Sequence, residues 1–588
     1  MRDIGTPAKT PLYCVPEGST RPLRVVMVGP SLIPGWLHAF HSLAAPYEWI
    51  ELIALVASDV KPPQVAGVPT DVRAVIALEH VLLKENCCLA PVAMPPGPGH
   101  ASAVHSDDRP LRERVSALRP DLVILLGPQA LANSLAAEAP MGCWQLDASL
   151  VDECHAGLSL LAPMVRGEQA TQMALMLMPT GSAPIDLAVS WGRTRVSSFL
   201  RQRQDAFRKL PALLVRALHR LAGGYVSAAP HSVATLQLQS QLPLGRGAGI
   251  RTLPLIARAF LRRITGRRRD GSIGWTLVLR LGGTPLDPES PVIGSHALLR
   301  ASKGWWADPF VVSAQGRRLV FVEEMLQPKR NNANIACVEL TEGGARRLGL
   351  ALDEPGHLSF PQVFAWQDRW YMTVESSYDR RVSLYRATDF PLEWVRVQDL
   401  VIGRVCVDPT LHHHEGHWYL FTNVAENGNS TSDELFLFVA DDLEGPFAPH
   451  PASPIVCDVR RARMAGRLFQ HHGRLIRPAQ DCGPGYGNAV VFNEVLELGP
   501  SVYHERQLSR LAPYLTRRVE GCHTYNAAGG VEVLDVFGRP PSGTAYLQVF
   551  DGSRTTRGND AALDSVRPTT TAGLPATGSR PHPGAPPR

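Results

Sequence analysis

The sequence predicts a multidomain protein in which an N-terminal α/β domain with an open parallel sheet precedes a C-terminal, all-β five-bladed propeller. Three observations predict this fold class. A chain of 588 residues exceeds what a single hydrophobic core supports. Its first part alternates apolar strand patterns with helix patterns, which is typical of a parallel sheet. Its second part repeats a hairpin pattern about every 50 residues, the period of a propeller blade.

The alternating strand and helix patterns define the first domain, which we expect to span residues 22–220. The segments PLRVVMVGPS and WIELIALVASD are apolar runs typical of strands buried on both faces. The segment LRERVSALRPDLVILLG combines a helix pattern, a proline break and a further strand. No GxGxxG follows the first strand, so we expect no dinucleotide cofactor. A basic helix pattern covers residues 193–221, and we expect it to break at Pro211.

The remaining segments are predicted to lie outside this domain. Residues 1–21 are expected to form a flexible leader, and residues 221–271 a linker that carries a basic helix. Short strands separated by turns then predict the propeller over residues 272–540. Residues 541–588 are rich in Pro, Thr and Gly, a composition that predicts a disordered tail.

Composition excludes several classes of protein. The formal net charge of +5 is small for this length, so no nucleic-acid partner is expected. The chain start lacks the apolar run of a secretory signal, and no run of about 18 apolar residues predicts an integral membrane segment.

Ten cysteines without CxxC pairs indicate reduced thiols and a cytoplasmic location. We expect no cofactor and no metal, because the run His412–His414 lacks the ligand spacing of a metal site.

A hairpin pattern recurs through the second half of the chain. Its clearest copies are QGRRLVFVEE, QDRWYMTVES, EGHWYLFTNV and HGRLIRPAQD, and a weaker copy is GGVEVLDVF. Each copy has a tight turn, a few large apolar residues and polar side chains towards the end of the strand. The turns fall at Gly316, Asp368, Gly416, Gly473 and Gly530. Five copies predict five blades around a central channel.

Polar side chains at one register of equivalent strands are expected to meet at one mouth of this channel, because strand side chains alternate between faces. Asp-Pro pairs stand in similar settings in KGWWADPFVV and VCVDPTLHHH. Carboxylates bind hydroxyls or transfer protons, and aromatic rings stack on sugars, so the set predicts a carbohydrate site. Its candidate catalytic residues are Asp308, Glu375, Asp408 and Asp481, and its candidate substrate-binding residues are Trp305, Trp306, Glu324, Arg463, Arg467 and His523.

Several motifs of the second half resemble one known family. KGWWADPFVV, HLSFPQVFAWQDRWYMTVESS, VDPTLHHHEGHWYLFT, RPAQDCGPGYGNAVVFNEV and GCHTYN occur in the order found in the N-terminal propeller of the glucosamine inositolphosphorylceramide transferase family. That five-bladed fold is akin to glycoside hydrolase family 43, and the resemblance covers about residues 290–536. It implies that Asp308 occupies the position of a general base and that Asp408 orients the substrate or tunes a pKa. The acid would then come from Glu375 or Asp481.

The first domain resembles the formyltransferase fold that uses a folate formyl donor, over about residues 22–190. That family carries an Asn-x-His-Pro-Ser segment and a later Asp. Here Gln145 stands at the Asn position, Asp147 at the His position and Ala183 near the later Asp. The resemblance therefore implies a degenerate site without the reaction, unless His155 or Asp186 substitutes.

The leading hypothesis is a carbohydrate-active or carbohydrate-binding protein of polysaccharide or glycolipid biosynthesis. Its partner would be a glycan or nucleotide-sugar held at the propeller mouth. If active, it would be a glycosyltransferase or a glycosidase-like enzyme. Two alternatives stay open, a sugar N-formyltransferase with an atypical active site and a non-catalytic glycan-binding scaffold.

Overall fold

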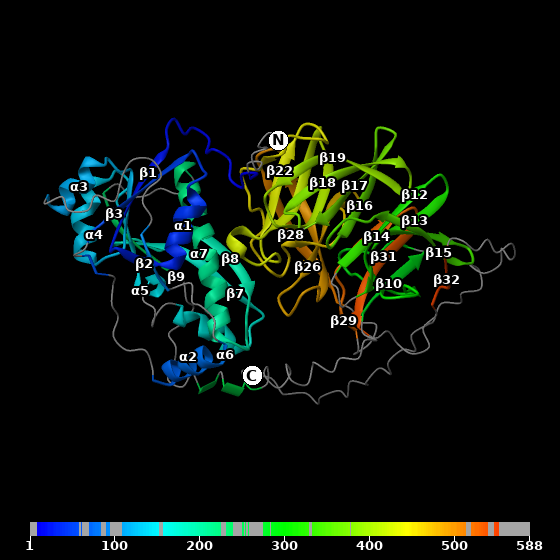
Figure 1. Ribbon diagram of the computed structural model, residues 1–588, viewed down its shortest axis with the longest axis horizontal. Helices are drawn as coiled ribbons and strands as arrows, with labels where there is room; N and C mark the ends of the chain where they lie inside the picture. Colours follow the sequence, from blue (N-terminus) through cyan, green and yellow to red (C-terminus); the bar gives the residue numbers. More distant parts are fainter. Residues whose placement is uncertain are drawn as a thin grey trace, which may run out of the picture.

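The α/β domain and the β-propeller pack against each other in the structure, which is a computed structural model (Figure 1). It describes residues 9–551 apart from gaps at 58–59, 62–69, 84–89, 95–108, 152–156, 225–230, 239–249, 252, 255–256, 258–273, 283, 328–331, 377, 513–518 and 539–545. The predicted fold class is confirmed. Most of the predicted basic helix, and the predicted tail from residue 552 on, lie outside the described residues. No helix within the described ranges is long and apolar enough to cross a membrane.

The first domain is built on a seven-stranded sheet with the order β3-β1-β5-β6-β9-β7-β8. The first five strands in this order are parallel, and β7 runs antiparallel to both of its neighbours. Strands β1, β3 and β5 are rich in Val, Leu and Ile and are almost entirely buried, as parallel strands covered by helices on both faces require. Their bounds are β1 (Leu23–Gly29), β3 (Ile50–Val56), β5 (Leu122–Leu125), β6 (Cys143–Leu146), β7 (Ala170–Pro179), β8 (Ile185–Arg193) and β9 (Val233–Leu238).

Helices and one small sheet complete this domain. Short strands β2 (Leu32–Pro34) and β4 (Pro91–Ala93) pair with each other beside the large sheet. The helices are α1 (Gly35–Ala44), α2 (Thr70–Leu83), α3 (Leu111–Ala117), α4 (Gln129–Leu135), η1 (Ala136–Glu138), α5 (Ala148–Val151), η2 (Leu158–Leu160), α6 (Leu161–Arg166) and α7 (Phe199–Ala222).

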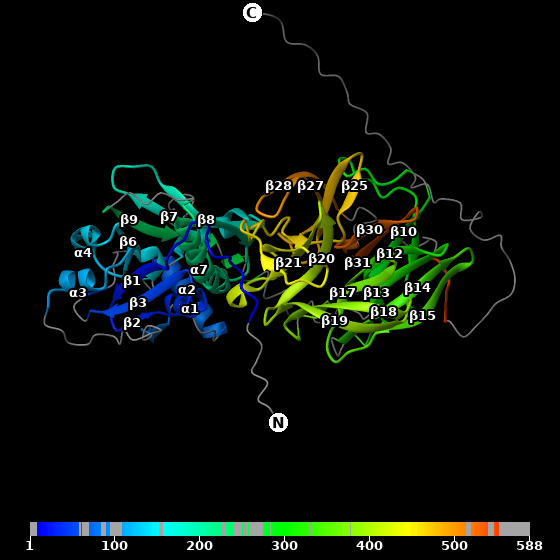
Figure 2. The same cartoon turned by 90° about the horizontal axis from the view of Figure 1, so that it is seen from above.

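Two segments predicted to lie outside the domains are packed into them. Strand β9 falls within the predicted linker, yet it sits between β6 and β7 in the sheet (Figure 2). In the predicted leader, Leu12 and Tyr13 are buried in the hydrophobic core, and the backbone N–H of Thr10 donates to the carbonyl of Ile402 at 3.0 Å. Both segments bury apolar side chains against distant parts of the chain, and this burial stabilises the fold. Local composition does not reveal such long-range packing.

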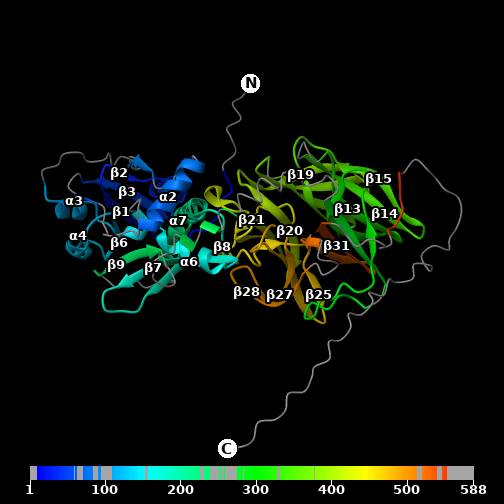
Figure 3. The same cartoon turned by 90° about the horizontal axis from the view of Figure 1, so that it is seen from below.

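Helix α7 runs without interruption through Pro211, so the predicted break is wrong. Ser198 caps the start of the helix by accepting a hydrogen bond from the backbone N–H of Arg201 at 3.2 Å. Most side chains of α7 are buried, and this packing offsets the backbone hydrogen bond that proline cannot make. Helix α7 and β8 lie at the side of the α/β domain that faces the propeller (Figure 3).

The described residues of the second half form five small antiparallel sheets, the five blades of the propeller. The last blade closes the ring, because β10 from the start of the domain pairs with β31 from its end. The first blade comprises β12 (Trp305–Ala314), β13 (Arg317–Gln327), β14 (Asn332–Thr341) and β15 (Gly344–Leu352), and the second comprises β16 (Ser359–Trp366), β17 (Arg369–Ser376), β18 (Arg381–Asp389) and β19 (Glu393–Ile402). The third comprises β20 (Cys406–His414), β21 (His417–Val424), β22 (Leu435–Ala440) and β23 (Ala448–Pro449), and the fourth comprises β24 (Arg463–Met464), β25 (Phe469–His471), β26 (Arg474–Asp481), β27 (Ala489–Leu498) and β28 (Tyr503–Leu511). The fifth comprises β10 (Gly274–Leu281), β11 (Ala297–Leu299), β29 (Val519–Gly521), β30 (Tyr525–Ala528) and β31 (Val531–Gly538). Strand β32 (Val549–Asp551) adds to the first blade, and η5 (Glu426–Gly428) follows β21.

The five predicted turns each join the innermost strand of a blade to the next strand. In every one of them both central residues have a positive φ, for example 51° at Gln315 and 76° at Gly316. This is the geometry of a type I′ turn, whose twist matches that of the paired strands. The remaining four turns are Gln367–Asp368, Glu415–Gly416, His472–Gly473 and Gly529–Gly530. The repeat read from the sequence is therefore the repeat of the blades.

A buried group of charges joins the two domains, and we call it the interdomain ion cluster (Lys209, Arg216, Glu426, Asp433 and Glu434). Lys209 Nζ lies 2.6 Å from the carboxylate of Asp433, and Arg216 pairs with both glutamates. Each of the five residues is less than 9% exposed. Removing one partner from such a cluster would leave a buried charge uncompensated, so the cluster fixes how α7 sits on the propeller.

Candidate functional site

Two aspartates of the predicted site occupy matching irregularities of the innermost strands. Pairing of β12 with β13 shifts over residues 307–310, where Asp308 has a φ of 47°. Pairing of β20 with β21 shifts over residues 407–410, where Asp408 has a φ of 50°. Proline follows each aspartate and has no N–H to contribute to the ladder, which favours a bulge there. A third bulge, at Phe360-Pro361 in β16, was not predicted.

The bulges bring several predicted residues together around the propeller axis. We call Asp308, Glu375, Asp408, Arg463 and His523 the axial cluster, and the end of the channel that it occupies the propeller mouth. All five are buried, with exposed fractions between 1% and 8%. Arg463 lies within reach of the carboxylates of both Asp408 and Glu375, and His523 lies 3.6 Å from the carboxylate of Asp308.

Arg463 connects two carboxylates on one side of the axis. Its guanidinium donates to Asp408 from Nε at 2.6 Å and from Nη2 at 3.2 Å, and Nη2 lies 3.7 Å from the carboxylate of Glu375. The amide of Gln480 donates a further hydrogen bond to Asp408 at 2.9 Å. The backbone N–H of Asp408 donates to Glu375 at 3.2 Å. These contacts give the buried Asp408 carboxylate the charged partner that it needs.

His523, Thr524 and Asp535 hold Asp308 on the other side. The hydroxyl of Thr524 donates to the Asp308 carboxylate at 2.8 Å, and the backbone N–H of Asp308 donates to Asp535 at 2.9 Å. His523 places Nδ1 2.7 Å from Asp535 and Nε2 3.6 Å from Asp308. The ring of Trp275 stacks on His523 with centroids 3.8 Å apart.

Asp308, His523 and Asp535 offer three donor atoms that lie within 4.8 Å of one another. Carboxylate and imidazole donors suit several divalent cations. In this arrangement, however, His523 and Asp535 already satisfy each other through their 2.7 Å contact. The sequence prediction did not include Asp535.

Burial and neighbouring charges separate the pKa values of the titratable groups. Burial raises the pKa of Glu375 to about 8, and Asp408 adds to this effect while Arg463 opposes it. Burial also raises the pKa of Asp308 to about 7, against the opposing charge of His523. Burial alone would lower the pKa of His523, but Asp535 and Asp308 outweigh it and raise the pKa to about 9. At neutral pH, Glu375 therefore holds a proton and His523 is charged.

The structure places three predicted residues, Asp481, Trp306 and Glu324, away from the axial cluster. Asp481 accepts a hydrogen bond from Nε of Arg510 at 2.7 Å, because it points to the opposite face of β26 from Gln480. Trp306 is 1% exposed and packs in the core between blades, where its Nε1 donates to Glu324 at 2.9 Å. Glu324 also pairs with Arg347. Trp306 and Glu324 therefore contribute to the packing between blades and do not form an exposed surface on which a sugar could stack.

Arg467 and Trp305 occupy the edges of the predicted site. Arg467 Nη2 donates to the carbonyl oxygens of Val311 at 3.0 Å and Val363 at 3.3 Å, so it links two innermost strands. Trp305 is half-buried at the start of β12 and packs against Gly274. Neither residue contacts the carboxylates of the axial cluster within the described part of the chain.

A positional signal in the sequence could have identified Gln480. Glu323, Glu375, Asn423 and Gln480 each stand seven residues after a predicted turn residue, namely Gly316, Asp368, Gly416 and Gly473. Each pairs with the innermost strand of its blade next to the bulge or break. Glu323 adds to the electrostatic environment of Asp308. Side chains at this register point to the propeller mouth, and the side chain one position later in each strand points away from it.

Tyr486 covers the mouth and was missed by the sequence prediction. Its ring lies 4.8 Å from the guanidinium carbon of Arg463, and its centroid lies 5.4 Å from that of His523. It is 52% exposed. The loop that carries it is held by Arg193 of the α/β domain, whose Nη2 donates to the carbonyl of Pro484 at 2.9 Å. The mouth therefore opens beside the junction of the two domains.

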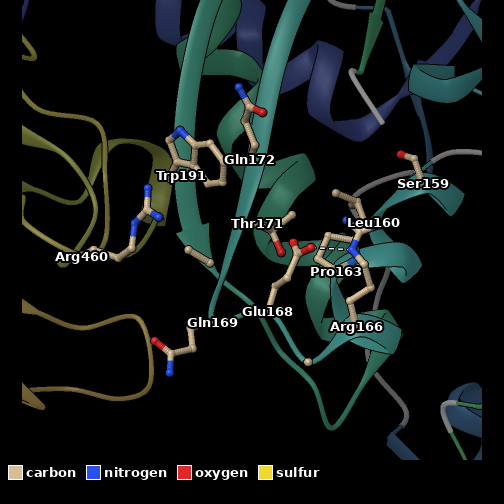
Figure 4. Close-up of a pocket in the computed structure, with 12 residues that line it drawn as sticks. Ser159, Leu160, Pro163, Arg166, Glu168, Gln169, Thr171, Gln172, Trp191 and Arg460 are labelled. Carbon is tan, nitrogen blue, oxygen red and sulfur yellow. Dashed lines mark hydrogen bonds and ion pairs between the residues drawn. The ribbon is translucent and has the colours of Figure 1, made fainter. Parts of the chain in front are cut away.

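A further cavity lies on this junction, lined by residues of the α/β domain and by Arg460 of the propeller (Figure 4). None of the residues of the axial cluster lines it. Its volume is about 530 Å³. Gln172 and Trp191 stand opposite each other on β7 and β8, and Arg460 reaches from the propeller to lie 4.8 Å from the Trp191 ring. Backbone hydrogen bonds join Trp191 to the propeller at Cys457 and Val459.

The positions matched to formyltransferases do not form one site. Gln145 donates to the carbonyl of Gly127 at 2.8 Å, and the carboxylate of Asp147 accepts from the backbone N–H of Ser149 at 2.8 Å. Both lie at the carboxyl end of β6, whereas Ala183 and Asp186 are exposed where β7 turns into β8. His155 lies outside the described residues. The formyltransferase resemblance stays a prediction.

Comparisons with known proteins agree with the propeller resemblance. Residues 290–552 match a family model described as glucosamine inositolphosphorylceramide transferase 1, N-terminal. The transferase of that name from Arabidopsis thaliana is 32% identical over 322 residues, which are 50% of this chain and 41% of the relative. The one from Oryza sativa subsp. japonica is 31% identical over 258 residues, which are 43% of this chain and 34% of the relative. The chain thus spans about two fifths or less of the length of these relatives.

Two similar solved structures each cover somewhat less than half of the chain. A family 117 glycoside hydrolase from Zobellia galactanivorans has a TM-score of 0.30 at 13% identity and covers 45% of this chain and 90% of its own. A GH43 β-xylosidase/α-arabinofuranosidase from a compost metagenome has a TM-score of 0.31 at 11% identity and covers 46% and 99%.

Proposed function

We propose that this protein acts on a glycan in polysaccharide or glycolipid biosynthesis. The proposal starts from its propeller, which matches the N-terminal domain of glucosamine inositolphosphorylceramide transferases. The glycan is held at the propeller mouth, beneath Tyr486. The single observation that carries this proposal is the convergence of Asp308, Glu375 and Asp408 beside Arg463. Its physical basis is that burial raises the pKa values of Asp308 and Glu375, while Asp408 is paired with Arg463.

The three carboxyl groups are suited to different steps of glycosyl transfer. Glu375, with a pKa raised by burial to about 8, can give a proton to a leaving oxygen. Asp308, with a pKa raised by burial to about 7, can accept a proton from an attacking hydroxyl or water. Asp408 is paired with Arg463 and orients the substrate through hydrogen bonds. Asp481 takes no part in this scheme because it is paired with Arg510.

The second candidate function is non-catalytic glycan binding. One observation favours it, since each carboxyl group of the axial cluster is at most 8% exposed and has a protein partner. A substrate would have to displace Tyr486 or one of these partners to reach the carboxyl oxygens. For the catalytic and the binding version alike, the cysteine pattern predicts a cytoplasmic location.

Substitution of the two titrating carboxyl groups tests the proposal. A glycan array probed with the full chain identifies an oligosaccharide ligand, and turnover of that ligand is then measured. We expect Asp308→Asn and Glu375→Gln each to lower turnover at least 100-fold, in the range of general acid–base effects, and to keep binding. Asp481→Asn is the matched control and should keep turnover. Unchanged turnover in Asp308→Asn would favour the binding version, and an empty array would exclude both versions.

A further inference from the structure

The cavity beside Trp191, which we call the junction cavity, has walls of mixed apolar and polar character (Figure 4). Helix α6, the start of β7 and Trp191 on β8 line it, and the propeller contributes Arg460. Its volume of about 530 Å³ lies in the range of roughly 300–1,000 Å³ that small-molecule sites occupy. Such sites occur preferentially at domain interfaces, so the junction cavity has the size and the place of a binding site.

The charged side chains that line the junction cavity all have partners of opposite charge. Arg166 pairs with Glu168, and Figure 4 shows the two side chains in contact. Arg460 lies over the Trp191 ring and donates two hydrogen bonds to Asp458, of 2.9 Å from Nε and 2.7 Å from Nη2. Because each charge is compensated by a neighbour, the lining favours an uncharged ligand.

Uncharged groups of the lining match the chemistry of a sugar. They include the indole ring of Trp191, the amides of Gln169 and Gln172 and the hydroxyl group of Ser159. An aromatic ring offers a surface for the C–H face of a sugar, and amides both donate and accept hydrogen bonds with its hydroxyl groups. Trp191 is half-buried and Gln169 is exposed, so a ligand can reach both from solvent.

The loop that covers the propeller mouth also borders the junction cavity. A Cβ atom at Gly483 of this loop would lie 3.4 Å from Cγ of Arg460 and 3.6 Å from Cβ of Gln169. Further along the same loop, the ring of Tyr486 lies over Arg463 of the axial cluster. One short loop therefore separates the junction cavity from the propeller mouth, and a glycan of several units can contact both.

We infer that the junction cavity binds an uncharged sugar unit, and that this unit belongs to the glycan that is held at the propeller mouth. The chemistry of the lining carries the first part of this inference. The second part rests on the proposed function, because the glycan at the mouth is itself proposed there. The substrate is then an oligosaccharide or a polysaccharide and not a single sugar.

A glycan array with uncharged, acidic and phosphorylated oligosaccharides of graded length, probed with the full chain, tests the inference. We expect the array to retain uncharged glycans, and longer members of a series more tightly than shorter ones, because two linked sites act together. Trp191→Ala should weaken binding of the longer members about tenfold, and Gln169→Ala about threefold. Gln398→Ala is the matched control for Gln169→Ala and should bind as the wild type does, because Gln398 is exposed on β19, the outermost strand of the second blade.

The pattern of losses decides between the possible outcomes. If Trp191→Ala does not fold, Gln169→Ala still tests the cavity, because the Gln169 side chain is exposed. Unchanged binding in the folded variants, or an array that retains no glycan, would overturn the inference. Losses confined to acidic or phosphorylated glycans would overturn the choice of an uncharged sugar, and equal losses for short and long members would overturn the shared glycan.

Variants of the two places separate this inference from the proposed function. Binding that Tyr486→Ala weakens, but that Trp191→Ala and Gln169→Ala leave unchanged, would contradict only the junction cavity. Binding that Trp191→Ala and Gln169→Ala weaken, but that Tyr486→Ala leaves unchanged, would contradict the glycan at the propeller mouth and keep the sugar site in the junction cavity.

Discussion

The guanidinium of Arg463 clasps the carboxylate of Asp408 with two hydrogen bonds, of 2.6 Å from Nε and 3.2 Å from Nη2. Asp408 comes from a bulge in the third blade, and Arg463 begins the innermost part of the fourth. The pair therefore joins two blades at the propeller mouth. Both side chains are buried, at 2% and 8% side-chain exposure, so neither can be solvated by water alone.

Replacing Arg463 with methionine is expected to lower the free energy of unfolding. Arg463→Met leaves Asp408 buried without its cation, which typically costs about 3–5 kcal/mol. Urea denaturation measures the change. Arg166→Met is the control, because Arg166 pairs with Glu168 where both side chains are more than a third exposed, and such pairs contribute about 0–1 kcal/mol. Equal effects of both substitutions would contradict a special role of the Arg463–Asp408 pair.

The pH dependence of stability should report the protonated state of Asp308. Its folded pKa is raised by burial to about 7, whereas an unfolded chain has an aspartate pKa of about 3.9. Between these values the unfolded state binds fewer protons than the folded state, so this group makes stability fall as pH rises. Between pH 4 and pH 7, the free energy of unfolding of the wild-type protein should fall by roughly 2–4 kcal/mol relative to that of Asp308→Asn. A constant difference over this window, measured by urea denaturation, would show that Asp308 is ionised when folded.

Local turn chemistry explains why the propeller could be predicted from the sequence. Gly316, Gly416 and Gly473 each follow a residue that also has a positive φ, and this two-residue signal lies within the hairpin itself. Strand β9 and the buried Leu12 gave no such signal, because their packing depends on partners far along the chain. Pro211 misled the prediction for the same reason, since tertiary burial of α7 outweighs the local preference.

The candidate site was predictable only in part. Asp308 and Asp408 carry a local signal, because a following proline favours a bulge. The choice between Gln480 and Asp481 depends on strand register, and one residue of offset moves a side chain to the other face. Tyr486 stands in a loop without periodicity, and its position depends on contact with the α/β domain through Arg193. Registers and loop positions of this kind are set by three-dimensional packing.

Replacing Arg216 with methionine should weaken the attachment of the α/β domain to the propeller. Arg216→Met leaves Glu426 and Glu434, which are 1% and 2% exposed, without their shared cation. We expect a loss of about 3–5 kcal/mol and separate unfolding transitions for the two domains. Arg220→Met, on the exposed side of the same helix, should change stability by about 0.5 kcal/mol or less. A single cooperative transition at unchanged stability in Arg216→Met would show that the interdomain ion cluster does not hold the domains together.

The ring of Tyr486 should matter for glycan binding more than its hydroxyl group does. The ring lies over Arg463 and is half-exposed at the mouth, so a sugar could pack on it with its C–H face. Tyr486→Ala is expected to weaken binding of the oligosaccharide found on the array about tenfold, which corresponds to about 1.4 kcal/mol. Tyr486→Phe keeps the ring and should bind within about twofold of the wild type, a difference of less than about 0.5 kcal/mol. If Tyr486→Phe loses as much affinity as Tyr486→Ala, the hydroxyl group and not the ring contacts the glycan. Calorimetry of the three proteins at one pH decides between these outcomes, because Arg463 keeps its bonds to Asp408 in each of them.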